Sequence, residues 1–377
     1  MSLRIDKHYI PDLRDNDFKN ILKVFRSKKF VDGIYRNYCE KFIKKKINSN
    51  FIGLTRSCAH ALEISTQLLN LKQDDEVILP SFTFSATLDA ILFSNAKPIF
   101  ADINLHNLCI DLNDVEKKIT NRTKAIFLVH YGSNICDMEK VIKIKKKYNL
   151  KIVEDSAHSI FGKLKNKYAG TFGDIGAFSF HESKNFCSGQ GGAISVNNKN
   201  LIKKCNLILD KGNDLKNLKK NNFLYFTHKS YGSEYRLEEL PSALLINQLK
   251  RYKKIIKKRK KIYNFYKHVC HQNKFNNKKF YYINIDKNIQ SNFHNFSIIF
   301  YSKSISNQFM RYMKKNNIYV ATHYYPLHLS PLGKKFSNKK LPNTEKIFNR
   351  LIRLPLNTEI NEKQLKYFKK IFNSFFL

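Results

Sequence analysis

Three features are scarce or missing in this 377-residue sequence: acidic side chains, paired cysteines and long apolar runs. The seven cysteines include no CxxC pair and no Cys/His spacing of the kind that a structural zinc site needs. No stretch approaches the roughly 18 apolar residues of a membrane span, and residues 1–17 lack the apolar core of a signal peptide. We therefore expect a soluble, cytoplasmic protein with reduced thiols, no bound metal and no membrane insertion.

The shortage of acidic residues leaves a large basic excess. Lys and Arg number 68 against 30 Asp and Glu, a formal net charge of +38. Such an excess often marks a nucleic-acid-binding protein. Here the clusters, such as the one in 251–263, lie within an apolar rhythm of helical type and indicate solvated helix faces. The abundance of Lys, Asn and Ile indicates compositional drift of the genome. We expect no specific nucleic acid, and only affinity that persists at high salt would support that alternative.

Short apolar runs alternate with helical patterns from about residue 51, which is typical of a mostly parallel sheet with helices on both faces. Strands are expected at 51–55, 76–80, 98–102, 124–130, 151–155, 175–180 and 192–198. The later part of the chain changes to Lys-rich helices, with strand-like runs at 292–301 and 316–325. The length and this change predict a large α/β domain over 1–243 and a smaller α+β domain over 244–377.

Ligands of an open α/β sheet gather at the carboxyl ends of its strands. In "TRSCAHALEI", Thr55 or Ser57 can cap the helix that follows, and the free N–H groups of 58–60 then form an anion site. In "KIVEDSAHS", Asp155 ends a buried strand, where it is suited either to a helix cap or salt bridge or to holding a protonated heteroaromatic nitrogen.

Lys184 in "FSFHESKNF" follows a mostly apolar run and precedes a glycine-rich stretch. Most lysines of this chain are expected to be exposed. At a strand end, however, partial desolvation favours the neutral amine that a Schiff-base lysine requires. An anion cradle, a buried Asp and a strand-end Lys together predict a pyridoxal 5'-phosphate site.

Ordered motifs over nearly the whole chain support this interpretation. The segments "PSFTFSATLDAILFSNAKPIFADI", "TKAIFLVHYGSNICDME", "VEDSAHS", "GTFGDIGAFSFHESKN" and "GQGGAISVNN" resemble the nucleotide-sugar aminotransferases of the type I pyridoxal phosphate fold. Within that family, "FSFHESKN", "HYYPLHLSPLG" and "RLIRLPL" are most similar to the 4-aminotransferases that act on dTDP-4-dehydro-6-deoxy-D-glucose.

The resemblance implies an enzyme, its cofactor, substrates and assembly. The amino group would pass from L-glutamate through the cofactor to carbon 4 of the keto sugar, giving dTDP-4-amino-4,6-dideoxy-D-galactose for surface polysaccharides such as lipopolysaccharide. A homodimer with shared active sites is implied as well.

The resemblance also implies a role for individual residues. Lys184 would form the Schiff base with the cofactor and move the proton during transfer. The implied cofactor-binding residues are Asp155 at the pyridinium nitrogen, Phe84 on the ring face, His158 at the phenolic oxygen, Ser179 with the amides of Cys58 and Ala59 at the phosphate, and Asn185. The candidates for contact with the sugar nucleotide are His181, His323, Tyr324 and His328, each of which is as readily explained as a structural side chain.

Some positions depart from the family pattern. His158 replaces a common Gln, and Ala59 with His60 removes one hydroxyl contact to the phosphate. Glu234 stands where many members have an Asn that reaches the partner's phosphate, and we expect this carboxylate to point elsewhere. Pro241 replaces a usual Gln without an obvious consequence.

Alternatives remain within and outside the enzyme class. Related sugar dehydratases have His in place of the lysine, so Lys184 argues against that activity. A 3-keto or UDP-linked sugar would need few altered residues. A degenerate, non-catalytic homologue is the alternative from another class, although Asp155, Phe84, Ser179 and Asn185 are all retained with the lysine.

Overall fold

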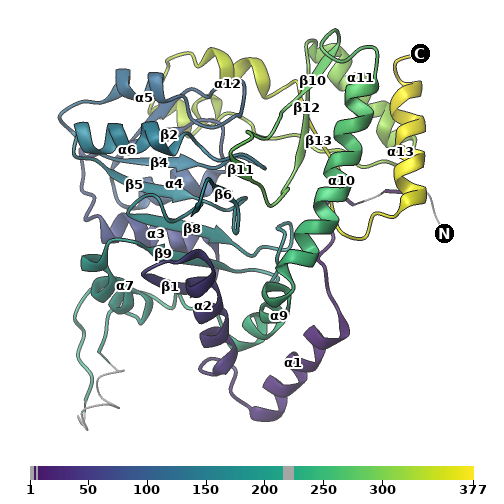
Figure 1. Cartoon of the computed structure of the whole chain (residues 1–377). Coiled ribbons are helices and arrows are strands. Elements are labelled where there is room, and N and C mark those ends of the chain that lie inside the picture. The colour runs from purple at the N-terminus through teal and green to yellow at the C-terminus, as the bar shows by residue number, and fades with distance from the viewer. Residues whose placement is uncertain (1–3, 6, 215–224) are drawn as a thin grey trace.

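A seven-stranded sheet forms the centre of the larger part of the molecule (Figure 1). The computed structural model describes residues 4–5, 7–214 and 225–377. The sheet has the strand order β1-β9-β8-β5-β4-β2-β3. All strands except β9 run in the same direction. Their bounds are β1 Phe51–Thr55, β2 Glu76–Pro80, β3 Lys97–Ala101, β4 Thr123–Val129, β5 Lys151–Asp155, β8 Ile175–Ser179 and β9 Gly192–Val196.

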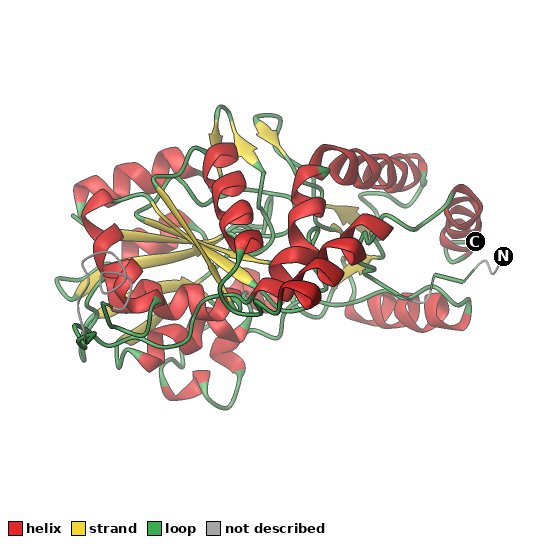
Figure 2. Cartoon of the chain, turned by 90° about the horizontal axis from the view of Figure 1, so that it is seen from below, coloured by secondary structure: helices red, strands yellow, loops and turns green. Residues whose placement is uncertain are grey.

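The strands carry apolar side chains on both faces because helices cover both (Figure 2). One face, with Leu79 and Phe127, packs against α3, α4 and α7. The opposite face, with Ile126, packs against α5 and α6, and its other end against α2 and α9. These helices are α2 Ile34–Ile47, α3 Cys58–Leu68, α4 Ser85–Phe93, α5 Leu112–Lys118, α6 Met138–Lys147, α7 Ile202–Leu209 and α9 Glu239–Lys250. The expected α/β architecture with helices on both faces is confirmed.

A second, antiparallel sheet of order β10-β12-β13 lies beside the first, with α10, α11 and α13 around it (Figure 1). Tyr266, Phe309 and Phe368 are buried between this sheet and these helices. The elements are α10 Tyr252–Gln272, β10 Phe280–Tyr282, β12 Phe296–Phe300, α11 Lys303–Lys315, β13 Leu351–Leu354 and α13 Glu362–Ser374. The domain boundary expected after residue 243 falls inside α9, and the division into two domains stays a prediction.

The remaining elements join the two parts of the molecule. A small sheet pairs β11 with β6 and β7, and therefore links a late segment to the edge of the large part. Figures 1 and 2 both place the C-terminal end of the chain beside the smaller sheet, away from the large one. The bounds are α1 Asp15–Ser27, β6 Lys163–Leu164, β7 Lys167–Tyr168, β11 Ile289–Gln290 and α12 Pro342–Ile347.

One expected strand is wrong and another is shorter than expected. Residues 316–325 form no strand, because the segment makes only single bridges, Ile318 with Ile5 and Ala321 with Arg353, before it leaves the sheet edge. In 292–301 only β12 is a strand. Both irregular segments lead side chains toward the large sheet, where the candidate site lies.

Glu154 on β5 fixes the central strand to its surroundings. Its carboxylate is fully buried and accepts hydrogen bonds from the backbone N–H groups of Gly170 at 2.8 Å and Gly173 at 2.5 Å. His130 contacts the same carboxylate at 2.9 Å. His130 Nδ1 accepts a hydrogen bond from the N–H of Cys136, so His130 Nε2 carries the proton. Nε2 therefore donates a hydrogen bond to the Glu154 carboxylate. One side chain thus joins β5, the end of β4 and the loop before β8.

We expect Glu154→Gln to lower the free energy of unfolding by about 3 kcal/mol, because the amide places a donor against buried donors. Urea unfolding followed by circular dichroism measures the change. Glu362→Gln, which breaks only an exposed pair with Lys261, is the control and should leave the midpoint almost unchanged. Equal midpoints for the two variants would contradict this role of Glu154.

Candidate active site

A cavity of about 560 Å³ lies at the carboxyl edge of the large sheet. Ligands commonly bind at this edge, because parallel strands end there together and their loops lead into helix N-termini. The predicted residues that line the cavity are Lys184, Asp155, His158, Ser179, Cys58, Ala59, Phe84, His181, His323 and Tyr324. Segments that are far apart in the sequence therefore meet at this cavity, while the roles expected for these residues stay predictions.

Lys184 lies in the loop after β8 and opens onto the cavity. Its backbone N–H donates to the carbonyl of His181 at 2.9 Å, which holds the loop in a turn. Burial lowers the pKa of its amine to about 8, opposed in part by Asp155 and Cys58. More of this amine than of an ordinary lysine is therefore neutral, and nucleophilic, near neutral pH.

Asp155 ends β5 and is buried. Its carboxylate accepts hydrogen bonds from Thr87 Oγ1 at 2.9 Å and from the N–H of Ala157 at 3.1 Å. Burial nevertheless raises the pKa of this carboxyl group. A cationic ring nitrogen placed against it would restore the charged form, which is the pairing that a pyridinium cofactor needs.

The backbone at the start of α3 forms a cradle for an anion. Ser57 is the N-cap, and its Oγ accepts a hydrogen bond from the N–H of His60 at 3.1 Å. The expectation that the N–H of His60 is free is therefore wrong, and the amides of Cys58 and Ala59 remain. A Cβ at Gly192 would lie 2.5 Å from the nitrogen of Cys58, so only glycine allows β9 to pass this close.

Ser179 and Phe84 complete the shape that a ring with a phosphate requires. The buried Ser179 ends β8 and lines the same cavity as the cradle amides. Phe84, the N-cap residue of α4, is 63% exposed and lines the cavity. The cradle, Asp155 and Lys184 thus match the phosphate, ring nitrogen and aldehyde of pyridoxal phosphate.

Three histidines and a tyrosine are stacked along one wall of the cavity. The ring of His158 lies 4.3 Å from that of His294 and 5.9 Å from that of His323, and His323 stacks on Tyr324 at 4.0 Å. Burial lowers the pKa of all three histidines well below the usual value. The wall is therefore neutral at physiological pH.

His158 has a defined tautomer. Its Nδ1 accepts a hydrogen bond from the N–H of Gly132 at 3.2 Å, so Nε2 carries the proton and donates to Tyr324 Oη at 3.3 Å. The replacement of Gln by His at this position thus retains a hydrogen-bond donor without adding a charge. In this structure Tyr324 receives that hydrogen bond, and contact of His158 with the phenolic oxygen of the cofactor stays a prediction.

Two predicted site residues lie outside the cavity. Asn185 is buried and holds other side chains in place: its amide donates to the carbonyl of Asn292 at 2.8 Å and its Oδ1 contacts His294 Nδ1 at 3.0 Å. His328 is buried with both ring nitrogens occupied, by Ser81 Oγ at 2.6 Å and Glu345 at 3.2 Å. Both side chains lie outside the described lining of the cavity and contact other protein groups, so the structure gives them positioning roles instead of the ligand contacts that were expected.

Glu234, one of the departures from the family pattern, forms ion pairs within its own chain. Its carboxylate pairs with Lys211 and, at 3.4 Å, with Arg56. Glu234 is not among the residues that line the cavity, and the expectation that it does not bind a partner's phosphate stays a prediction.

Several cavity residues were not predicted. Thr87, His294 and Arg353 reach the cavity or Asp155 from α4, the segment before β12 and β13. Thr87 was detectable in principle, because it lies one helical turn after Thr83 next to the aromatic Phe84. The other two carry no local signal, since their approach depends on how the smaller sheet packs.

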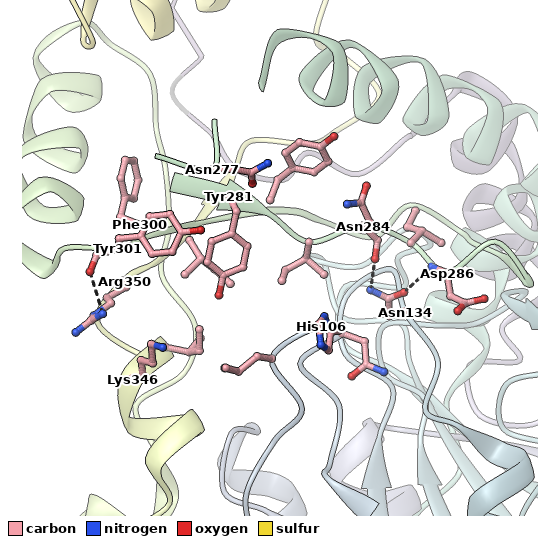
Figure 3. A pocket seen from close by; sticks show the side chains of 17 residues that line it. His106, Asn134, Asn277, Tyr281, Asn284, Asp286, Phe300, Tyr301, Lys346 and Arg350 are labelled. Carbon is pink, nitrogen blue, oxygen red and sulfur yellow. Dashed lines mark hydrogen bonds between the residues drawn. The ribbon is translucent and has the colours of Figure 1, made fainter. Parts of the chain in front are cut away.

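A second cavity, of about 600 Å³, opens between the smaller sheet and the loop that contains His106 (Figure 3). Its wall includes Tyr281, Tyr301, Lys346 and Arg350. Among the described residues that line it, the one carboxylate, Asp286, is exposed, so this cavity does not reproduce the buried Asp155 of the Lys184 cavity.

Comparison with known proteins identifies the family. The family model described as the DegT/DnrJ/EryC1/StrS aminotransferase family matches residues 11–372. The chain belongs to this family. GDP-perosamine synthase of Escherichia coli O157:H7 is 30% identical over 90% of this chain and 90% of its own length.

Two further relatives extend the comparison. The UDP-4-amino-4,6-dideoxy-N-acetyl-beta-L-altrosamine transaminase of Campylobacter jejuni is 28% identical over 85% of each chain. The solved structure of Helicobacter pylori PseC, an aminotransferase of pseudoaminic acid biosynthesis, superposes with a TM-score of 0.90 and 27% identity over 99% of each chain.

The protein is therefore an aminotransferase with pyridoxal phosphate as its cofactor. When bound, this group carries an amino group between two substrates and stabilises negative charge on carbon. Lys184, Asp155 and the α3 cradle are the residues that fit it. None of the helices in the described part of the chain has the length and apolar character needed to cross a bilayer.

The pKa of Lys184 predicts how cofactor capture depends on pH. Aldehyde attack requires the neutral amine, whose fraction rises up to the folded-state pKa of about 8 and not the ordinary 10.5. We expect the rate at which the apoenzyme acquires the visible band of the bound cofactor to rise with pH and level off above about 8. The Lys184→Ala variant is the control, and it should not acquire this band if the band arises from the bond between Lys184 and the cofactor. A rate that keeps rising past pH 9.5 would show an unperturbed lysine.

Proposed function

We propose that this aminotransferase transfers an amino group from L-glutamate to carbon 4 of dTDP-4-dehydro-6-deoxy-D-glucose. The product would be dTDP-4-amino-4,6-dideoxy-D-galactose, a precursor of surface polysaccharide. The observation that carries the proposal is the shared cavity of Lys184, Asp155 and the α3 cradle. The sugar assignment is supported by the resemblance of "HYYPLHLSPLG" and "RLIRLPL", two segments that bring His323, Tyr324 and Arg353 to this cavity.

Each residue has a defined task in this proposal. Asp155 holds the protonated ring nitrogen, and the amides of Cys58 and Ala59 with Ser179 hold the phosphate. Lys184 moves the proton between the substrate carbon and the cofactor, because its amine is partly neutral near pH 8. His181, His323 and Tyr324 line the cavity and are proposed to contact the sugar nucleotide.

We further propose a cytoplasmic homodimer whose active sites are shared. Large apolar side chains exposed on the first two helices, among them Phe18 at 51%, Leu22 at 53% and Phe25 at 55%, support a protein interface. A cation-rich surface would also attract a dianionic nucleotide sugar to the cavity.

A GDP- or UDP-linked keto sugar is the second candidate substrate. The names of the two curated relatives refer to GDP- and UDP-sugars, which favours this alternative. The choice is tested by absorption spectra of the cofactor-loaded protein. We expect glutamate to remove the visible band and dTDP-4-dehydro-6-deoxy-D-glucose to restore it. Restoration only by the GDP or UDP keto sugar would replace the dTDP assignment and keep the class of reaction.

We expect Lys184→Ala to abolish turnover while cofactor binding is weakened but retained, since Asp155 and the cradle are untouched. Turnover is followed by product chromatography, and binding by equilibrium dialysis of the cofactor. Lys165→Ala, an exposed lysine paired with Glu139, is the control and should keep full activity. Wild-type turnover in the Lys184 variant would end the proposed mechanism.

A further inference from the structure

Arg353 on β13 brings a positive charge into the wall of the Lys184 cavity. The residue is only 9% exposed. Its Nη1 donates to His323 Nε2, and His323 Nδ1 lies 3.2 Å from Tyr131 Oη. Since a guanidinium only donates, Nε2 of His323 is the acceptor, and its Nδ1–H points at the tyrosine. This chain of contacts fixes one edge of the guanidinium.

The other edge of the guanidinium is free. Nε of Arg353 is buried and has no hydrogen-bond partner among the described residues, and no contact of Nη2 within that set involves a protein acceptor. These two nitrogens form the side-on edge that binds a carboxylate through two parallel hydrogen bonds. A buried donor without an acceptor lowers the stability of the folded state, so this edge of Arg353 is suited to binding a ligand that accepts hydrogen bonds.

Other arginines that are buried or half-buried have acceptors of their own; the buried Arg36, for example, is paired with Asp32. Arg236 is paired with Asp210, and Arg251 with Asp12 and Asp17. Arg259 donates to the backbone carbonyls of Phe293 and His294 at 2.9 and 2.6 Å. Within the described residues, Arg353 forms no ion pair with a carboxylate. A buried, unpaired charge destabilises the folded state unless an anion joins it.

The cavity as a whole has an excess of positive charge. Arg353 and Lys184 both line it, and Asp155 is the one acidic residue among its described lining residues. Asp155 already accepts hydrogen bonds from Thr87 and Ala157 and belongs to the ring-nitrogen position. The cavity is therefore suited to a second anionic group in addition to a phosphate at α3.

We propose that the free edge of Arg353 binds the carboxylate of the amino donor. The inference rests on the proposed function. In an α-amino acid the carboxylate and the reacting amino group share one carbon atom, so the carboxylate stays inside the cavity near Lys184. In a nucleotide sugar the diphosphate lies a sugar ring away from carbon 4. A buried guanidinium beside the reacting lysine therefore suits the donor better than the acceptor.

The glutamate half-reaction and the keto-sugar half-reaction can be measured separately, which distinguishes binding of the amino donor from binding of the nucleotide sugar. We expect Arg353→Met to lower kcat/KM of the glutamate half-reaction about a hundredfold, the usual effect of losing a charged hydrogen-bonded pair. With the pyridoxamine form supplied directly, the keto-sugar half-reaction should change less than about threefold. Arg353→Lys should retain part of the donor rate. Arg350→Met, which lies in the second cavity (Figure 3), is the matched control and should leave both rates unchanged.

Binding of glutarate, a dicarboxylate without an amino group, gives a readout that is independent of turnover. Calorimetry should detect glutarate binding to the cofactor-loaded wild type and to Arg350→Met, and not to Arg353→Met. A loss confined to the keto-sugar half-reaction would assign the guanidinium to the diphosphate and overturn the proposal. Unchanged donor kinetics with glutarate still bound would overturn it as well. A wild type that binds glutarate through Arg353 and transfers no amino group would refute only the proposed function.

Discussion

The carboxylate of Glu154 is the interaction on which the site depends. It binds two backbone N–H groups of the loop before β8 and the ring of His130 at the end of β4. Because side chains alternate along a strand, fixing Glu154 on one face directs Asp155 to the other. The same contacts set the approach of β8, whose carboxyl end leads into Lys184. The buried carboxylate of Glu154 thus positions Asp155 and Lys184, the two side chains expected to act on the cofactor.

The parallel sheet and the main chemistry were predictable from local patterns. Apolar runs of five to seven residues, several of them followed by helical patterns, predicted the strands. The run 151–155 matches β5, and the run 175–180 extends one residue beyond β8. The shared edge followed from parallel pairing. His323 and Tyr324 were also found, although in a segment wrongly expected to be a strand. Their position depends on that segment leaving the sheet after a single bridge.

Arg353 and His294 were not predictable because they act across long separations in sequence. Each is unremarkable beside its chain neighbours and acquires a role only when the smaller sheet packs against the carboxyl edge. The wrong prediction for His328 has a related cause, because the residue types in this segment do not indicate the direction in which each side chain points. Its ring turns to Ser81 and Glu345, while His323, five residues earlier, turns into the cavity.

The stacked histidines have a consequence for the charge of the cavity. Burial keeps His158, His294 and His323 uncharged far below neutral pH. They therefore supply donors and acceptors that do not change as the surroundings become more acidic or alkaline. The protonation of this wall is therefore constant around neutral pH, whereas the neighbouring amine of Lys184, with a pKa of about 8, titrates. Histidine usually changes its charge near neutral pH, whereas these three side chains remain neutral and serve as fixed hydrogen-bonding groups.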